Sequence, residues 1–262
     1  MNVHMGVTVG GLTLKNPVLS ASGTFGYGVE YADYLELKSL GGIIVKGLSL
    51  EPRGGNPPPR IIETASGMLN AVGLQNVGVR AFIDEKLPAL RGIDSAVIAN
   101  IFGESIDEYV RVAEILNDAE GVDAIEVNIS CPNVKKGGVT FGSDPLIAGE
   151  VTREVKKTSR LPVIVKLTPN VTDISKIARS VEAAGADAVS LINTLTGMSI
   201  DIEKRIPHLK NITGGLSGPA MKPVALRMVW ETVNAVSIPV IGVGGIMNAS
   251  DALEFLIAGA QA

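Results

Sequence analysis

Short apolar runs rich in β-branched residues alternate along the chain with longer segments of helical periodicity. Nearly continuous apolar runs are typical of parallel strands that are buried on both faces, with helices as the crossovers between them. The predicted strands are residues 17–21, 43–46, 96–101, 124–129, 163–167, 188–192 and 240–243. The predicted helices include residues 106–118, 145–158, 174–184 and 219–236. The pattern therefore predicts an α/β fold around a parallel sheet.

Seven strands fit either an open doubly wound sheet or a (β/α)₈ TIM barrel that lacks one unit. The segment at residues 184–188 (AGADA) leads into a strand, and residues 258–262 (AGAQA) repeat that lead-in. This echo favours the barrel, with the eighth βα unit missing from the sequence. We therefore expect residues 1–262 to form one barrel domain of a longer working polypeptide.

Polar residues and glycines follow the predicted strands at the end where barrel active sites lie. They are Ser20, Ser22, Lys46, Asn100, Asn128, Cys131, Lys166, Asn193, Thr194, Gly244 and Gly245. Lysines inside apolar strands need a partner to justify burial. Lys46 and Lys166 have no carboxylate beside them in the sequence, so we interpret them as ligands of a bound anion. A structural ion pair is the alternative.

Cys131 lies just beyond a predicted strand, before a proline and a Lys-Lys-Gly-Gly loop at residues 135–138. A free cysteine is most often a small buried apolar residue. Its place at the mouth of the predicted site, before a potential lid, favours a catalytic thiol acting as nucleophile or general base. His4 and His208 lie in a tail and a polar loop, and we expect both at the surface.

A glycine turn at residues 241–246 (IGVGGI) resembles the phosphate-binding turn that follows the seventh strand of many barrels. It is not a dinucleotide-binding fingerprint, because Met247 stands where the third glycine would be. Gly218, in the glycine-rich segment 211–219, could add another backbone donor.

Composition narrows the function classes. The chain has 23 basic and 27 acidic residues, a net charge of −4 and no basic stripe, which argues against nucleic-acid binding. Its one cysteine can form neither an internal disulfide nor an iron–sulfur cluster, and we find no metal-ligand spacing. No signal peptide and no apolar run near the roughly 20 residues of a membrane span are visible. We expect a cytoplasmic protein that binds no membrane.

Four motifs occur together and in order: residues 70–76 (NAVGLQN), 128–134 (NISCPNV), 192–194 (INT) and the Gly244-Gly245 turn. Together they resemble the dihydroorotate dehydrogenases, flavin enzymes of pyrimidine biosynthesis, from about Lys15 to the last residue. Cysteine in the second motif, where the membrane-bound class has serine, marks the soluble class. The Lys-Lys-Gly-Gly continuation is similar to the NAD-linked type.

The resemblance implies specific residue roles. FMN would be held by Ser22, Lys46, Gly47, Asn100, Asn128, Lys166, Ile192, Gly218, Gly244 and Gly245. Dihydroorotate would be held by Lys46, Asn70, Ala71, Val72, Gly73, Leu74, Asn128, Asn193 and Thr194. The family's Gly-Thr pair after the eighth strand, which completes its flavin phosphate site, has no counterpart in this sequence.

The implied reaction oxidises (S)-dihydroorotate to orotate, with Cys131 taking the C5 proton and the C6 hydride passing to FMN. Lys166 near the flavin N1–C2 edge would stabilise the reduced flavin. The NAD-linked type is a heterotetramer, in which a homodimer of this chain would pair with a partner subunit that carries FAD and a [2Fe–2S] cluster. That partner would pass electrons to NAD⁺.

Four alternatives stay open at this point. The chain could be a fumarate-using homodimer, a dihydropyrimidine- or dihydrouridine-oxidising flavin barrel, or a non-redox aldolase or isomerase barrel that binds phosphate. A non-catalytic barrel explains the polar strand ends least well.

Overall fold

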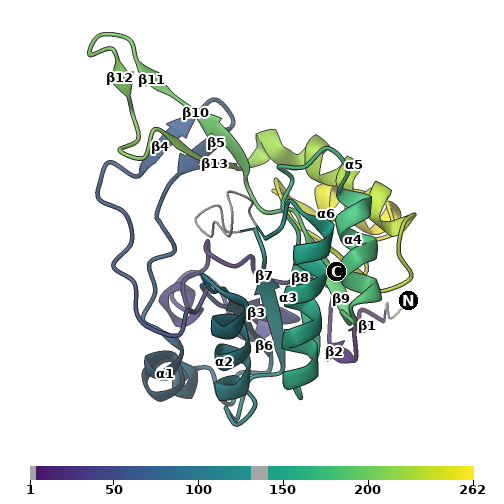
Figure 1. Cartoon of the computed structure of the whole chain (residues 1–262). Coiled ribbons are helices and arrows are strands. Elements are labelled where there is room, and N and C mark those ends of the chain that lie inside the picture. Colours follow the sequence, from purple (N-terminus) through teal and green to yellow (C-terminus); the bar gives the residue numbers. More distant parts are fainter. Residues whose placement is uncertain (1–3, 131–140) are drawn as a thin grey trace.

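A curled six-stranded parallel sheet forms the centre of the computed structural model, which describes residues 4–130 and 141–262 (Figure 1). The strands stand side by side in the order in which the chain makes them, as in a barrel wall. They are β3 (Gly42–Ile44), β6 (Ala96–Ile101), β7 (Ala124–Asn128), β8 (Val163–Lys166), β9 (Ala188–Leu191) and β14 (Val240–Gly242).

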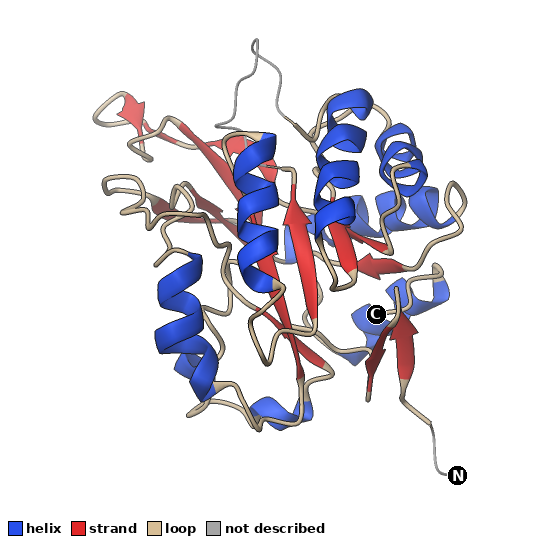
Figure 2. Cartoon of the chain, turned by 60° about the horizontal axis from the view of Figure 1, so that its bottom comes forward, coloured by secondary structure: helices blue, strands red, loops and turns tan. Residues whose placement is uncertain are grey.

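Helices connect these strands and lie around the sheet (Figure 2). They are α1 (Val79–Ala81), α2 (Ile106–Leu116), α3 (Pro145–Thr158), α4 (Ile174–Ala183), α5 (Lys222–Val233) and α6 (Ala249–Ile257). A π-helical turn, Phe82–Lys86, and 3₁₀ turns at Val29–Tyr31, Leu37–Ser39, Leu87–Ala89 and Pro219–Met221 complete the helical segments. In the described part of the chain, no helix is both long and apolar enough to span a membrane.

Alternate strand residues point to two different cores. Ile125 and Val127 of β7 belong to the larger cluster, which also holds the buried faces of the helices. Ala124, on the opposite face of β7, packs inside the curled sheet with Ile98, Ile164 and their counterparts on the other strands. Because successive side chains of a strand point to opposite faces, every second residue of the wall points into the interior.

The N-terminal hairpin fills the amino-terminal end of this interior. It consists of β1 (Val7–Val9) and β2 (Leu12–Leu14). Val9, Leu12 and Leu14 join the interior cluster and are almost fully buried. The site must therefore lie at the opposite end of the strands.

A second, antiparallel sheet follows the carboxyl-terminal ends of the parallel strands. Its strand order is β10 (Leu195–Met198), β13 (Thr213–Ser217), β5 (Gly67–Asn70) and β4 (Ile61–Thr64). A short hairpin of β11 (Ile200–Asp201) and β12 (Ile206–Pro207) projects beyond it (Figure 1). The sequence does not predict this sheet, and for the glycine-rich segment 211–219 it indicates only a backbone donor at Gly218.

The predicted barrel fold is confirmed, with local corrections. Six of the seven predicted parallel strands are present, but the first is reduced to a single bridge between Leu19 and Gly42. The four predicted helices are present, the last beginning as the 3₁₀ turn Pro219–Met221. Beyond β14, the ladder continues through Gln261 N–H to Val240 O and Gly242 N–H to Ala262 O, both at 2.8 Å.

Candidate functional site

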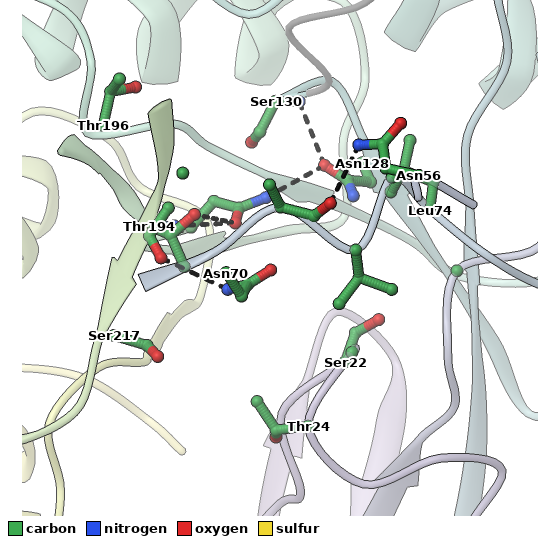
Figure 3. Close-up of a pocket in the computed structure, with 18 of the residues that line it drawn as sticks. Ser22, Thr24, Asn56, Asn70, Leu74, Asn128, Ser130, Thr194, Thr196 and Ser217 are labelled. Atoms are coloured by element: carbon green, nitrogen blue, oxygen red, sulfur yellow. Dashed lines mark hydrogen bonds between the residues drawn. The ribbon is translucent and has the colours of Figure 1, made fainter. Parts of the chain in front are cut away.

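A pocket of about 680 Å³ opens where the parallel strands end, between the barrel wall and the antiparallel sheet (Figure 3). Its volume lies within the range typical of small-molecule sites, about 300–1,000 Å³. The strand ends supply one side, and residues of β5, β10 and β13 supply the other.

Most of the residues predicted for the site line this pocket. They are Ser22, Lys46, Gly47, Asn70, Ala71, Val72, Gly73, Leu74, Asn100, Asn128, Lys166, Asn193 and Thr194. Residues from seven separated segments of the chain therefore converge on one cavity. Their roles toward a ligand stay predictions.

Four predicted cofactor residues lie outside the pocket lining, on the side of α5. Ile192 is buried and donates its N–H to Val243 O at 2.9 Å. Gly244 and Gly245 follow β14 with φ of 127° and 73°, and Gly218 has φ of 98°. Cys131, predicted as the base, and the loop at residues 135–138 lie outside the described residues.

The turn at Gly244 and Gly245 can bind an anion only through its backbone. A Cβ on Gly245 would lie 2.6 Å from the backbone N of Lys222, so the chain approaches α5 too closely for any side chain. The Lys222 ammonium contacts Asp251 at 2.7 Å and Glu254 at 2.8 Å. These hydrogen bonds raise the pKa of Lys222, and its positive charge is already paired with two carboxylates.

The environment of Lys166 corrects one part of the sequence interpretation. Lys166 does have a neighbouring carboxylate, because Glu126 Oε2 lies 3.8 Å from its Nζ, and both side chains are buried. Glu126 comes from β7, the adjacent strand, and no sequence motif indicates the pairing. The structural ion pair, held as the alternative, is therefore present, and an anionic ligand is not needed to explain Lys166.

Lys46 differs from Lys166. In residues 4–130 and 141–262, no carboxylate lies within ion-pair distance of its ammonium. Burial lowers the pKa of Lys46, the positive charge of Arg60 lowers it further, and Glu30 partly offsets both. A half-buried lysine repelled by an arginine is well placed to bind an anion that enters the pocket.

Asn128 and Asn193 are held by a chain of hydrogen bonds across the pocket (Figure 3). Asn128 Oδ1 accepts from Ser130 N at 3.1 Å and from Asn193 Nδ2 at 3.4 Å. Asn193 Oδ1 accepts from Thr194 N at 2.7 Å. Tyr109 Oη donates to Asn128 O at 2.7 Å and fixes the strand end. The amides are thus oriented before any ligand arrives.

Glycines let neighbouring segments of the lining pack closely. A Cβ on Gly47 would lie 2.9 Å from Asn100 Oδ1, and one on Gly215 would collide with Thr194 Oγ1. Asn70 Nδ2 donates to Gly215 O at 3.3 Å, which joins the predicted motif to β13. The residue types at 47 and 215 are therefore dictated by their close neighbours Asn100 and Thr194.

A large part of the lining was not predicted from the sequence. The missed residues are Gly23, Thr24, Asn56, Ile61, Met68, Ser130, Asn170, Thr196, Asn211, Thr213, Gly214, Gly215 and Ser217. Asn170 connects the walls, because it donates to Thr194 O at 3.0 Å and accepts from Thr196 N at 2.9 Å. The glycines in segment 211–219 were the available sequence signal, because a strand that packs this closely against the pocket residues has no room for larger side chains.

These residues fit a flavin. Asn100 Oδ1 is buried and has no hydrogen-bond partner in the part of the chain that the structure describes, so it is available to a ligand donor. Neutral amides and two lysines offer donors and acceptors to a planar heterocycle.

His208, expected at the surface, is half-buried away from the pocket and pairs with Ser199 Oγ at 3.0 Å.

Comparisons with known proteins agree with this geometry. The family model for dihydroorotate dehydrogenase matches residues 4–262. A dihydroorotate dehydrogenase B (NAD(+)), catalytic subunit, of Geobacter sp. (strain M21) is 62% identical over 258 residues, which are 98% of this chain and 85% of the relative. A protein of the same name from Trichlorobacter lovleyi is 58% identical over 262 residues, 100% of this chain and 86% of the relative. The resemblance inferred from the motifs is confirmed, and the chain belongs to the dihydroorotate dehydrogenase family.

Proposed function

We propose that this chain oxidises (S)-dihydroorotate to orotate in pyrimidine biosynthesis, with FMN bound at the carboxyl-terminal end of the barrel. The observation that carries the proposal is the convergence of Asn70, Asn128 and Asn193 with Lys46 in one pocket. Family membership supports the same reaction, and the relatives' name supports NAD⁺ as the final acceptor.

Substrate recognition follows from the donors and acceptors in the pocket. The substrate has a carboxylate and a ring with alternating N–H and C=O groups, which amides can match without adding charge. Lys46 would bind the carboxylate, because its ammonium lacks a carboxylate partner among the described residues. The hydrogen bonds between Asn128, Asn193 and Thr194 fix which amide atoms face the ring.

FMN, when bound, supplies the acceptor for the hydrogen that leaves C6 of the substrate. Its ring system would be held by Asn100, Lys166, Ser22 and Gly47. Backbone N–H groups at Gly218, Gly244 and Gly245 would hold its phosphate, since glycine turns and helix starts bind anions.

Cys131 is proposed as the base that takes the C5 proton. Its motif follows directly from Asn128 and Ser130, which line the pocket. A general base must come within hydrogen-bond reach of the proton it takes, and the sequence keeps Cys131 one residue from Ser130 of the pocket lining.

The electron acceptor and the assembly belong to the same proposal. The name of the relatives contains "catalytic subunit", which supports a partner subunit. We propose that a homodimer of this chain joins a partner that carries FAD and [2Fe–2S] and reduces NAD⁺, in the cytoplasm. A single barrel domain over residues 1–262 that lacks its eighth unit stays a prediction.

Substrate and acceptor assays test the proposal. With the partner subunit present, dihydroorotate should support NAD⁺ reduction, while the chain alone should not reduce fumarate. Fumarate reduction by the chain alone would replace the NAD-linked type with the homodimeric type. Faster oxidation of dihydrouracil than of dihydroorotate would contradict the substrate.

A further inference from the structure

A buried carboxylate that the proposed reaction does not use stands behind the pocket. Glu126, in the middle of β7, is fully buried in the barrel interior. Its side chain shares a strand face with Ala124 of the interior core and with Asn128 of the pocket. An ionised side chain at such a position needs partners for both of its oxygens.

Three side chains from three neighbouring strands meet this carboxylate. Asn100 Nδ2 of β6 donates to Oε2 at 2.5 Å, and Ser190 Oγ of β9 donates to Oε1 at 2.7 Å. Lys166 Nζ of β8 lies 3.8 Å from Oε2. The four side chains form one polar layer between the apolar floor and the pocket.

The layer is exposed to the pocket on one side only. Asn100 and Lys166 line the cavity, whereas Glu126 and Ser190 do not. Because Asn100 gives its N–H₂ group to Glu126, its Oδ1 is left as the acceptor that faces a ligand, and this atom has no partner in the described residues. Glu126 thus decides which end of the Asn100 amide the ligand meets.

Glu126 also changes the charge of the pocket floor. Lys166 alone would present one full positive charge, but Glu126 neutralises it from behind within the same low-dielectric layer. A negative group at this place opposes added negative charge on a ligand, and reduction adds negative charge to a flavin.

We propose that Glu126 is a positioning residue of the flavin site, which orients Asn100 and Lys166 and keeps the reduction potential of the bound flavin low. This proposal rests on the proposed FMN site. Ser190 is the anchor that holds the second carboxylate oxygen in place.

The test compares Glu126→Gln with the wild-type chain in their affinities for oxidised and reduced FMN. Glutamine keeps the shape and removes the charge. Its affinity for reduced FMN should rise relative to that for oxidised FMN by about tenfold, a positive shift of about 30 mV in the two-electron midpoint potential. Glu150→Gln, at an exposed position of α3, is the matched control and should leave the ratio unchanged.

Ser190→Ala separates orientation from charge. This variant keeps the carboxylate charge but frees Oε1, so both redox forms of FMN should bind several-fold more weakly, with an unchanged potential. An unchanged affinity ratio in Glu126→Gln would overturn the role of the charge. If circular dichroism shows Glu126→Gln unfolded, wild-type FMN affinity in Ser190→Ala overturns the proposal instead. Failure of the wild-type chain to bind FMN would overturn the proposed function, and this inference with it.

Discussion

Lys46 and Lys166 both line the pocket, but only Lys166 has a buried ion-pair partner. Burial and Arg60 lower the pKa of Lys46, so its protonated form is less favourable in the folded chain than in the unfolded one. A lysine kept in such a place costs stability until a ligand anion pairs with it. At Lys46, the requirement for anion binding therefore opposes the stability of the ligand-free chain.

Replacement of Lys46 by methionine should therefore raise the melting temperature of the ligand-free chain while it weakens dihydroorotate binding by at least about tenfold. Below both pKa values, Lys46 is protonated in the folded and unfolded states, and the variant has its full advantage. As the pH rises through the lowered pKa of the folded state, Lys46 loses its proton in the folded wild-type chain before it does so in the unfolded chain. The stability difference between the variant and the wild-type chain therefore shrinks. Thermal melts of both proteins across pH check the sign, and a variant less stable at every pH would contradict it.

Cys131 carries a second prediction at this scale. Cys131→Ala should leave FMN bound but slow its reduction by dihydroorotate by about 10²–10⁴-fold, the usual contribution of a general base. Stopped-flow measurement of a single turnover checks this. Wild-type reduction rates in the variant would remove Cys131 from the role of base.

At the scale of elements, what the sequence predicts well is what burial dictates locally. The parallel strands are apolar on both faces, and α3 begins at Pro145 after Asp144, whose side chain caps it. The antiparallel sheet was not predicted, because β13 is rich in small residues and lacks the apolar pattern of a strand. Its partner Asn70 lies 145 residues away in the chain, so no local pattern indicates the pairing. The Glu126–Lys166 pair escaped for the same reason, since it depends on the register of β7 against β8.

The glycine turn after β14 gives a prediction for an element. Gly245→Ala should lower FMN affinity, because the new Cβ collides with the backbone of α5 and displaces the turn. Gly92→Ala is the control, with φ of 84° and no atom within 4 Å of the added Cβ. Both variants should lose about 1–3 kcal/mol of stability from strained backbone, but only the first should lose FMN affinity in a fluorescence titration. Equal FMN affinities would show that this turn does not hold the cofactor.

At the scale of the whole molecule, the barrel is built in layers along its axis. The hairpin of β1 and β2 closes one end, apolar residues fill the middle, and the layer of Glu126 and Lys166 separates them from the pocket. The antiparallel sheet then encloses a volume of about 680 Å³ at the other end. This arrangement places the polar groups where a flat, redox-active cofactor could contact both the interior layer and a substrate.

The most direct test of dihydroorotate oxidation is the absorption spectrum of the FMN-loaded chain under anaerobic conditions, before and after addition of dihydroorotate. We expect a bound flavin band that dihydroorotate bleaches, since the substrate would transfer its two electrons to the cofactor. A chain that retains no FMN, or a flavin band that stays unchanged with excess dihydroorotate, would contradict the proposed FMN-dependent oxidation of dihydroorotate.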